Sequence, residues 1–180
     1  DDLLLDIDWG FDFDDDWEEL EQGGIFYVVN DKDEVIITGY SEAIDKATIS
    51  IPSKIDGKPV TMIYEFAFCG LEKTKTINIP NSVKVIGAEA FAWCENLQTI
   101  NIPNSVTTID VAAFAGNDKL QSITIPNSVT ELGAAAFILN ENLTSVTLPN
   151  TISSIPYATF AGCVSLKKID IPSSVKTIEK

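Results

Sequence analysis

Residues 83–105 read VKVIGAEAFAWCENLQTINIPNS, and residues 106–128 repeat the same pattern as VTTIDVAAFAGNDKLQSITIPNS. Further units at the same 23-residue spacing start at Val60, Val129 and Ile152. A fixed period of about 20 to 50 residues indicates a solenoid, in which each unit buries its apolar face against the next one. The sequence therefore predicts a repeat array rather than a set of separately folded domains.

Aligning the units places apolar residues in shared columns. One column is entirely Phe, and two others hold only Ile, Val or Leu. These columns comprise Phe68, Phe91, Phe114, Phe137 and Phe160; Ile77, Ile100, Ile123, Val146 and Ile169; and Ile79, Ile102, Ile125, Leu148 and Ile171. A single unit cannot bury such a face alone, so we expect one continuous core along the stack.

In each unit, a short stretch such as LQTINI alternates apolar and polar residues. This alternation is typical of a β-strand with one buried face, so we expect one strand per unit in a parallel sheet. The proline that follows ends the strand because it cannot continue the hydrogen-bond ladder, and the next Asn-Ser pair suits a tight turn. Ala-rich stretches such as AEAFAWC are expected to form short helical or 3₁₀ turns on the opposite side.

The consensus I-P-N-S-V-x-x-I-x-x-x-A-F-x-x-C/N-x-x-L-x-x-I covers Pro52 to Lys180. It resembles the leucine-rich repeat of BspA-like bacterial surface proteins. The resemblance implies an α/β fold, a right-handed leucine-rich-repeat solenoid with a parallel β-sheet on one face and short turns and loops on the other. It also implies a non-enzymatic binding module of a cell-surface or secreted bacterial protein, used in adhesion to a protein or glycan of a host or neighbouring cell.

The first unit departs from the consensus, as end repeats often do. Thr74 stands where the other units have Leu, and Tyr64 stands where two of them have Gly. An insertion within SKIDGKP precedes Val60.

Three segments follow from these patterns. Residues 52–180 form the repeat array, whose sixth unit starts at Val175 and stops at Lys180, so we expect an array truncated at the C-terminus. Residues 25–51 contain two β-rich runs around an Asn-Asp-Lys-Asp turn, which predicts a β-hairpin that caps the open end of the sheet. Residues 1–24 are acidic and are expected to be either disordered or part of the cap.

The composition excludes some partners. The chain has 12 Lys, no Arg and 27 Asp and Glu, for a formal net charge of −15. Residues 1–24 hold 11 of these acids and no Lys, so the rest carries 12 Lys against 16 acids, a net charge of −4. Nucleic-acid binding needs clustered Lys and Arg, and no run approaches the ~18 apolar residues of a membrane span. We expect no nucleic-acid partner and no transmembrane segment.

The side chains offer little catalytic chemistry. The chain has no His, which removes the usual general base, the Ser and Cys triads and the commonest metal ligand. Cys94 and Cys163 share a column with Asn117 and Asn140, where leucine-rich repeats place Asn or Cys to satisfy buried backbone groups. These cysteines lie three coils apart, about 14 Å at the ~4.8 Å strand spacing, so they cannot form a disulfide. Cys69 is expected to be a small buried filler.

Two groups of acids invite metal or catalytic hypotheses. Glu72, Glu95, Asp118 and Glu141 form a column with neighbours about 5 Å apart, near the carboxylate spacing of retaining glycosidases. Acid catalysis would need one carboxyl group with a raised pKa, and a solvated turn provides no burial that would raise it. We therefore favour a solvent-exposed ridge of acids over a weak cation site or a catalytic pair. The N-terminal acids invite a Ca²⁺ hypothesis, but they lack the Gly and terminal Glu of an EF-hand loop, which favours a solvated linker. These acids are Asp6, Asp8, Asp12, Asp14, Asp15 and Asp16. We predict no catalytic residue, no metal site and no cofactor.

The outward columns of the strands hold short hydroxyl and amide side chains. Such a surface suits hydrogen bonding to a glycan or an extended protein better than electrostatic capture of an anion. The candidate binding residues on this face are Gln98, Thr99, Asn101, Gln121, Ser122, Thr124, Thr144 and Thr147.

A second candidate surface lies on the opposite side, where Trp93 and Leu139 stand in a column that is otherwise Gly70, Gly116 and Gly162. The glycine position of such a turn normally faces out, so both side chains are predicted to be exposed. With nearby apolar residues they would form a patch for ligand binding or weak self-association; these neighbours are Val111, Ile138 and Tyr157. The alternative is that the coils repack and bury them.

Two alternatives to a binding module remain open. The array is a structural spacer of a larger surface protein if its exposed surface has no ligand. An enzyme acting on polysaccharide has less support, because the sequence offers no nucleophile and base that can be named.

Overall fold

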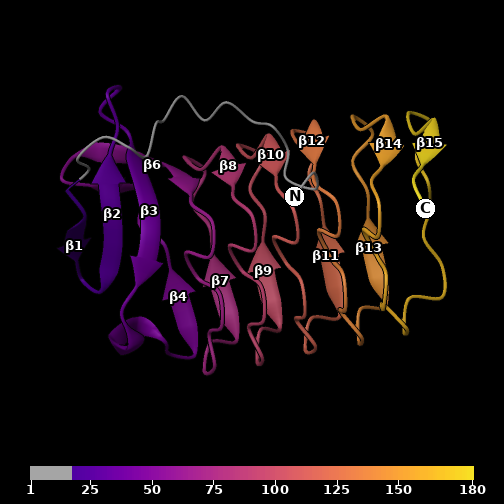
Figure 1. Cartoon of the computed structure of the whole chain (residues 1–180), viewed down its shortest axis with the longest axis horizontal. Coiled ribbons are helices and arrows are strands. Elements are labelled where there is room, and N and C mark those ends of the chain that lie inside the picture. Colours follow the sequence, from indigo (N-terminus) through magenta and orange to yellow (C-terminus); the bar gives the residue numbers. More distant parts are fainter. Residues whose placement is uncertain (1–17) are drawn as a thin grey trace.

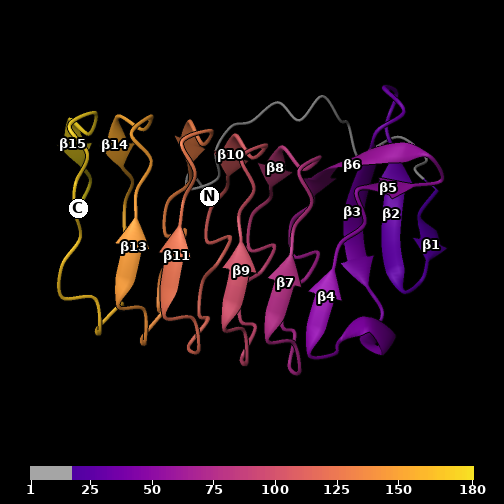
Figure 2. The same ribbon diagram turned by 180° about the vertical axis from the view of Figure 1, so that it is seen from behind.

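Each repeat folds into one coil, and the coils stack side by side along a single axis (Figure 1). The structure is a computed structural model, which describes residues 18–180. Two rows of strands run along the stack, and Figure 2 shows the same two rows from behind. The predicted repeat solenoid is confirmed.

Paired strands within each row run parallel and lie one repeat apart, as Ile77 and Ile100 do. The first row, made by the strands that precede the prolines, is called the first sheet below. It comprises a three-stranded part, β4 (Thr48–Ser50), β7 (Thr76–Asn78) and β9 (Thr99–Asn101), and a two-stranded part, β11 (Ser122–Thr124) and β13 (Ser145–Thr147). The second row is called the second sheet below. Its strands β6 (Lys58–Ile63), β8 (Val85–Ile86), β10 (Thr108–Ile109) and β12 (Glu131–Leu132) pair in series, and β14 (Ser154–Ile155) and β15 (Thr177–Ile178) form a separate pair at the C-terminal end.

Each coil therefore contributes two strands, where the sequence predicted one. The second strand comes from the segment that opens each unit, such as VKVI, in which Val85 and Ile86 pair with Thr108 and Ile109. Two residues are too few to show an alternating pattern, so this segment carries no strand signal of its own. It is a strand because the neighbouring coils pair with it.

A tight turn connects the two strands of a coil. The Val106 N–H donates to the Pro103 carbonyl oxygen at 3.1 Å across Asn104 and Ser105, and the same bond occurs after Pro80, Pro126 and Pro172. The predicted tight turn is thus confirmed after these four prolines.

The Ala-rich stretches on the far side form turns rather than helices. Alternate N–H groups bond within the coil, as Ala90 does to the Gly87 carbonyl at 3.2 Å, and the others bond to the next coil, as Phe91 does to the Ala113 carbonyl at 2.9 Å. Half of the donors that a helix would use are thereby taken by the neighbouring coil. The only helix in the part that the structure describes is the 3₁₀ turn η1 (Glu42–Ile44).

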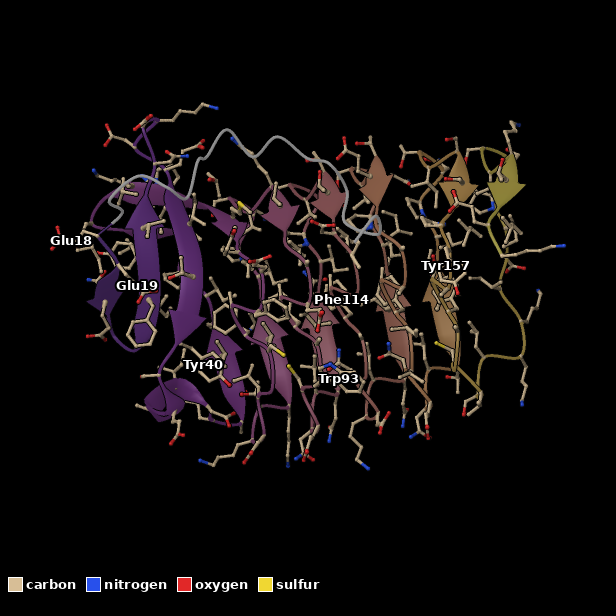
Figure 3. The ribbon with its side chains drawn as sticks, viewed as in Figure 1. Glu18, Glu19, Tyr40, Trp93, Phe114 and Tyr157 are labelled. Atoms are coloured by element: carbon tan, nitrogen blue, oxygen red, sulfur yellow. The ribbon has the colours of Figure 1, made fainter. Side chains whose placement is uncertain are left out.

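One aromatic ring per coil forms the centre of the core. Tyr40 and the five Phe of the repeat column stack in a row, with ring centroids 5.4 to 5.8 Å apart and interplanar angles of 2 to 11°. The first four Phe rings are fully buried, and Phe160 is partly exposed near the last coil. Phe114 lies between the two rows of strands (Figure 3).

The turn side alternates between two kinds of coil. Two coils have a glycine early in the turn and a large residue six positions later. The other three coils have the reverse order, with the larger residue first and the glycine second. The first kind comprises Gly87 with Trp93 and Gly133 with Leu139, and the second kind comprises Tyr64 with Gly70, Asp110 with Gly116 and Pro156 with Gly162. A Cβ at Gly116 would collide with the Trp93 ring, and a Cβ at Gly162 would lie 2.6 Å from Leu139 Cδ2. Each large side chain thus lies over the glycine of the next coil. Tyr64 fits this alternation and is more than an irregularity of the first repeat.

The N-terminal cap extends the second sheet. β1 (Leu20–Gln22), β2 (Ile25–Val29) and β3 (Val35–Tyr40) pair antiparallel, and β3 pairs parallel with β6. The predicted hairpin is confirmed, and β1 adds a short edge strand from the acidic segment. Residues 1–17 lie outside the described residues.

Two other departures of the first repeat from the consensus, Thr74 and the insertion before Val60, are explained by local contacts. Thr74, which replaces the consensus Leu, is buried with its hydroxyl 2.9 Å from Asp45 Oδ1 and 2.8 Å from the Lys46 carbonyl oxygen. The inserted residues form β5 (Lys54–Ile55), which pairs antiparallel with the start of β6. The first coil is therefore adapted to the cap beside it.

Candidate binding surface

The outward side chains of the first sheet face solvent. All eight candidate residues on β9, β11, β13 and the positions before them are exposed, whereas the intervening Ile100, Ile123 and Val146 are buried. Charged side chains occur in these columns only toward the ends of the array, at Lys75, Lys167, Lys168 and Asp170. The middle of the sheet thus presents a polar surface without formal charge.

A shallow open groove of about 540 Å³ runs beside this sheet, across the ends of its strands. Its lining repeats from coil to coil: Asn81, Asn104 and Asn127; Asn101, Thr124 and Thr147; Ile102, Ile125 and Leu148; and Pro103 and Pro126. A smaller hollow of about 270 Å³ shares Thr147 and Leu148 with it and extends to Asp170. The groove therefore brings together Asn101, Thr124 and Thr147, but not the other five candidate residues.

Several polar groups of the groove are available to a ligand. The side chains of Asn101, Asn104, Thr124 and Thr147 have no hydrogen-bond partner among the described residues, whereas Asn127 Oδ1 accepts the Asn150 N–H at 2.9 Å. The Asn residues of the turns were not among the predicted binding residues, because an Asn-Ser pair after proline is typical of a turn former. The return of Asn at the same phase in consecutive units was the signal.

The opposite candidate surface combines exposure with packing. Trp93 and Leu139 are exposed as expected, at 47% and 40% of their full area. Their other sides cover Gly116 and Gly162, so the expectation that every glycine of this column faces out is wrong for Gly116, which is buried. Tyr157 is also exposed but lies on a later coil, apart from Trp93 (Figure 3).

The repeat itself matches a known family. The model of the BspA type leucine-rich repeat region matches residues 61–180 in six copies. This chain belongs to that family.

Solved structures of bacterial proteins share the fold. A leucine-rich repeat protein of T. pallidum is 26% identical, with a TM-score of 0.68 over 89% of this chain and 86% of that one. One from Bacteroides ovatus is 30% identical, with a TM-score of 0.60 over 88% of this chain and 49% of that one. The pneumococcal vaccine antigen PcpA, at 24% identity and a TM-score of 0.71, shares the fold over 90% of this chain and 42% of its own. No curated protein sequence matches the chain.

The Asn and Cys column of this BspA-type array is structural, as predicted. Asn117 Nδ2 donates to the carbonyls of Phe91 and Phe114 at 3.0 and 2.9 Å, and its Oδ1 accepts the Cys94 N–H at 3.0 Å. Cys94 Sγ lies 3.3 Å from the Phe68 carbonyl oxygen. Burial raises the pKa of the Cys94 thiol to about 12, so this thiol stays protonated and is a poor nucleophile at neutral pH.

The acidic column lies in solvent. Glu72, Glu95, Asp118 and Glu141 are all exposed, and the described residues contain no group of three or more His, Cys, Asp or Glu placed to hold a metal ion. The acids of the calcium hypothesis lie outside the described residues. The part of the chain that the structure describes has no helix that could cross a membrane.

Proposed function

We propose that this BspA-type array is a non-enzymatic binding module of a cell-surface or secreted bacterial protein, and that the outward face of its first sheet recognises a protein or glycan of a host or neighbouring cell. The observation that carries the proposal is that β9, β11 and β13 present an exposed polar face without charge. Surface location rests on the resemblance of the repeat to BspA-like bacterial surface proteins.

The scaffold supports recognition because its surface is formed before a ligand arrives. Backbone hydrogen bonds join successive coils on the turn side as well as in both sheets, and the stacked Phe rings fill the interior. A preorganised surface loses little conformational entropy on binding, which leaves more of the contact energy for affinity.

The non-enzymatic part of the proposal rests on the side chains present. The chain has no His, burial raises the pKa of the Cys94 and Cys163 thiols, and the acidic column is exposed. The Cys94 and Cys163 thiols contact backbone carbonyl oxygens, at 3.3 Å from that of Phe68 and 3.1 Å from that of Phe137, rather than a base that would activate them.

A binding screen tests the proposal. The purified chain is applied to immobilised glycans and extracellular-matrix proteins together with a face variant that combines Asn101→Ala, Gln121→Ala and Thr124→Ala. The control combines Thr107→Ala, Thr130→Ala and Ser153→Ala, which truncate exposed side chains beside the second sheet. We expect a ligand that binds the parent and the control but binds the face variant weakly.

Other outcomes point to other functions. A chain that binds nothing in the screen acts as a spacer within a larger surface protein. Turnover of a polysaccharide that is lost in Glu95→Gln would instead support an enzyme.

A further inference from the structure

We propose that the groove beside the first sheet binds an uncharged polysaccharide chain, laid along the solenoid axis with about one sugar ring per coil. This inference rests on the proposed function and narrows it to one ligand class and one site. The volume of about 540 Å³ falls within the ~300 to 1,000 Å³ of ligand pockets.

The periodic lining favours a polymer over a single small molecule. Consecutive coils each contribute an Asn from the turn, a polar residue from the strand end and an apolar residue between them. Parallel strands lie about 4.8 Å apart, so this set of groups returns at that interval. A ligand that makes the same contacts in each coil must itself repeat at a similar interval, as a chain of linked pyranose rings does.

The chemistry of the lining matches a neutral sugar. Asn101, Asn104, Thr124 and Thr147 offer donors and acceptors without described partners, which suit ring hydroxyl groups. The apolar residues of the lining, Pro103 and Pro126 among them, are buried and form its floor, so the exposed contacts that the groove offers are mainly polar. No described residue that lines the groove is charged, so nothing there favours an ionised polymer.

An extended peptide fits the same groove less well. Its side chains return to one side every two residues, about 6.6 to 6.8 Å, which is out of step with the coil spacing after one coil. Peptides that recognise sheets do so by adding to an exposed edge strand. This groove crosses the ends of several strands instead.

Titration calorimetry with uncharged oligosaccharides tests the proposal. The probes are β-1,4- and β-1,3-linked gluco-oligosaccharides and mannan oligosaccharides of one to six rings. We expect affinity for one series to rise with each ring until the coils of the groove are filled, and then to level off. Raising NaCl from about 50 to 500 mM should leave the affinity nearly unchanged, because no ion pair is screened.

Two matched variants locate the site. Thr124→Lys places a long side chain in the groove, whereas Thr130→Lys adds the same charge at an exposed position beside the second sheet, away from the groove. Thr124→Lys should weaken binding about tenfold or more, the loss expected for at least one to two hydrogen bonds. Thr130→Lys should bind like the parent, and unchanged thermal melting shows that both variants fold.

The remaining outcomes overturn the proposal in distinguishable ways. If a saccharide binds but both variants behave alike, the groove is not its site and the proposed function stands. If no saccharide binds but a matrix protein does, the ligand class is wrong and the binding module stands. If neither saccharide nor protein binds, the proposed function fails as well.

Discussion

Phe91 stacks on Phe68 with ring centroids 5.5 Å apart and on Phe114 at 5.7 Å, and it is fully buried. Its ring therefore contacts both neighbouring coils. This residue-scale contact links the repeat in the sequence to the continuity of the core.

Truncating this ring should be costly. Phe91→Ala should lower the free energy of unfolding by about 3 to 5 kcal/mol, because it removes a buried ring and leaves a cavity between two coils. Urea unfolding followed by circular dichroism measures the change. Phe160→Ala is the control, with a smaller expected loss because its ring is partly exposed. A Phe91→Ala variant that unfolds like the parent would contradict the stacked core.

Cys94 gives a prediction about pH. Burial raises the pKa of its thiol to about 12 in the folded chain, against an ordinary value of 9.0. Above pH 9 the unfolded chain releases this proton while the folded chain keeps it, so the thiol contributes stability that is lost as pH rises from about 9 to about 12.

Cys94→Asn tests this effect, because Asn117 and Asn140 show that the column accepts Asn. The variant should fold at pH 7 and lose less stability than the parent between pH 9 and 11. Equal alkaline losses in the two proteins would show that the Cys94 thiol is not shielded in the folded state.

At the scale of the elements, the turns depend on alternating coils. Gly116 has a φ of 67° and lies under the Trp93 ring, whereas Gly70 has a φ of 76° and open space around its Cα. Gly70→Ala should therefore lower the free energy of unfolding only by the cost of a left-handed backbone at Ala, about 1 to 2 kcal/mol. Gly116→Ala should lose more, because its Cβ also collides with the indole.

A double-mutant cycle isolates the collision. Gly116→Ala should destabilise the chain more than Gly70→Ala does, and the excess is the cost of the collision. Adding Trp93→Gly to Gly116→Ala removes the ring and should recover this excess stability, as measured by thermal unfolding. If Gly116→Ala costs no more than Gly70→Ala, the Trp93 ring does not lie over Gly116 in solution.

The sequence predicted the elements that carry their own periodic signal. The Phe column, the first sheet and the Asn turns follow from residues that recur every 23 positions. The second strand of each coil did not follow, because Val85 and Ile86 form it only by pairing with other coils. The Ala-rich turns were expected to include helix because Ala has helical propensity, but their donors bond to neighbouring coils.

The candidate binding surface was likewise predictable from the sequence only in part. Exposure of the outward columns could be predicted from alternation along the strand. The groove could not, because it forms where the strand ends of adjacent coils meet the Asn turns, a juxtaposition that no single unit specifies.

At the scale of the whole molecule, the turn face is a second place for contacts. We expect weak self-association through Trp93 and Leu139, whose exposed apolar surface is small compared with a stable dimer interface. Sedimentation equilibrium should show that Trp93→Ala reduces association, while Tyr157→Ala, which removes an equally exposed ring elsewhere, does not. If Trp93→Ala associates as strongly as the parent, Trp93 does not contribute to self-association and serves only to pack over Gly116.

The measurement that tests the central claim most directly is an NMR titration of the ¹⁵N-labelled chain with the ligand selected by the binding screen. Side-chain amide signals of Gln98, Asn101 and Gln121 report on the first sheet, and the Trp93 indole N–H reports on the opposite side. The account predicts that the amide signals shift with ligand concentration while the indole signal stays in place. A shifting indole with unchanged sheet amides would contradict recognition by the first sheet.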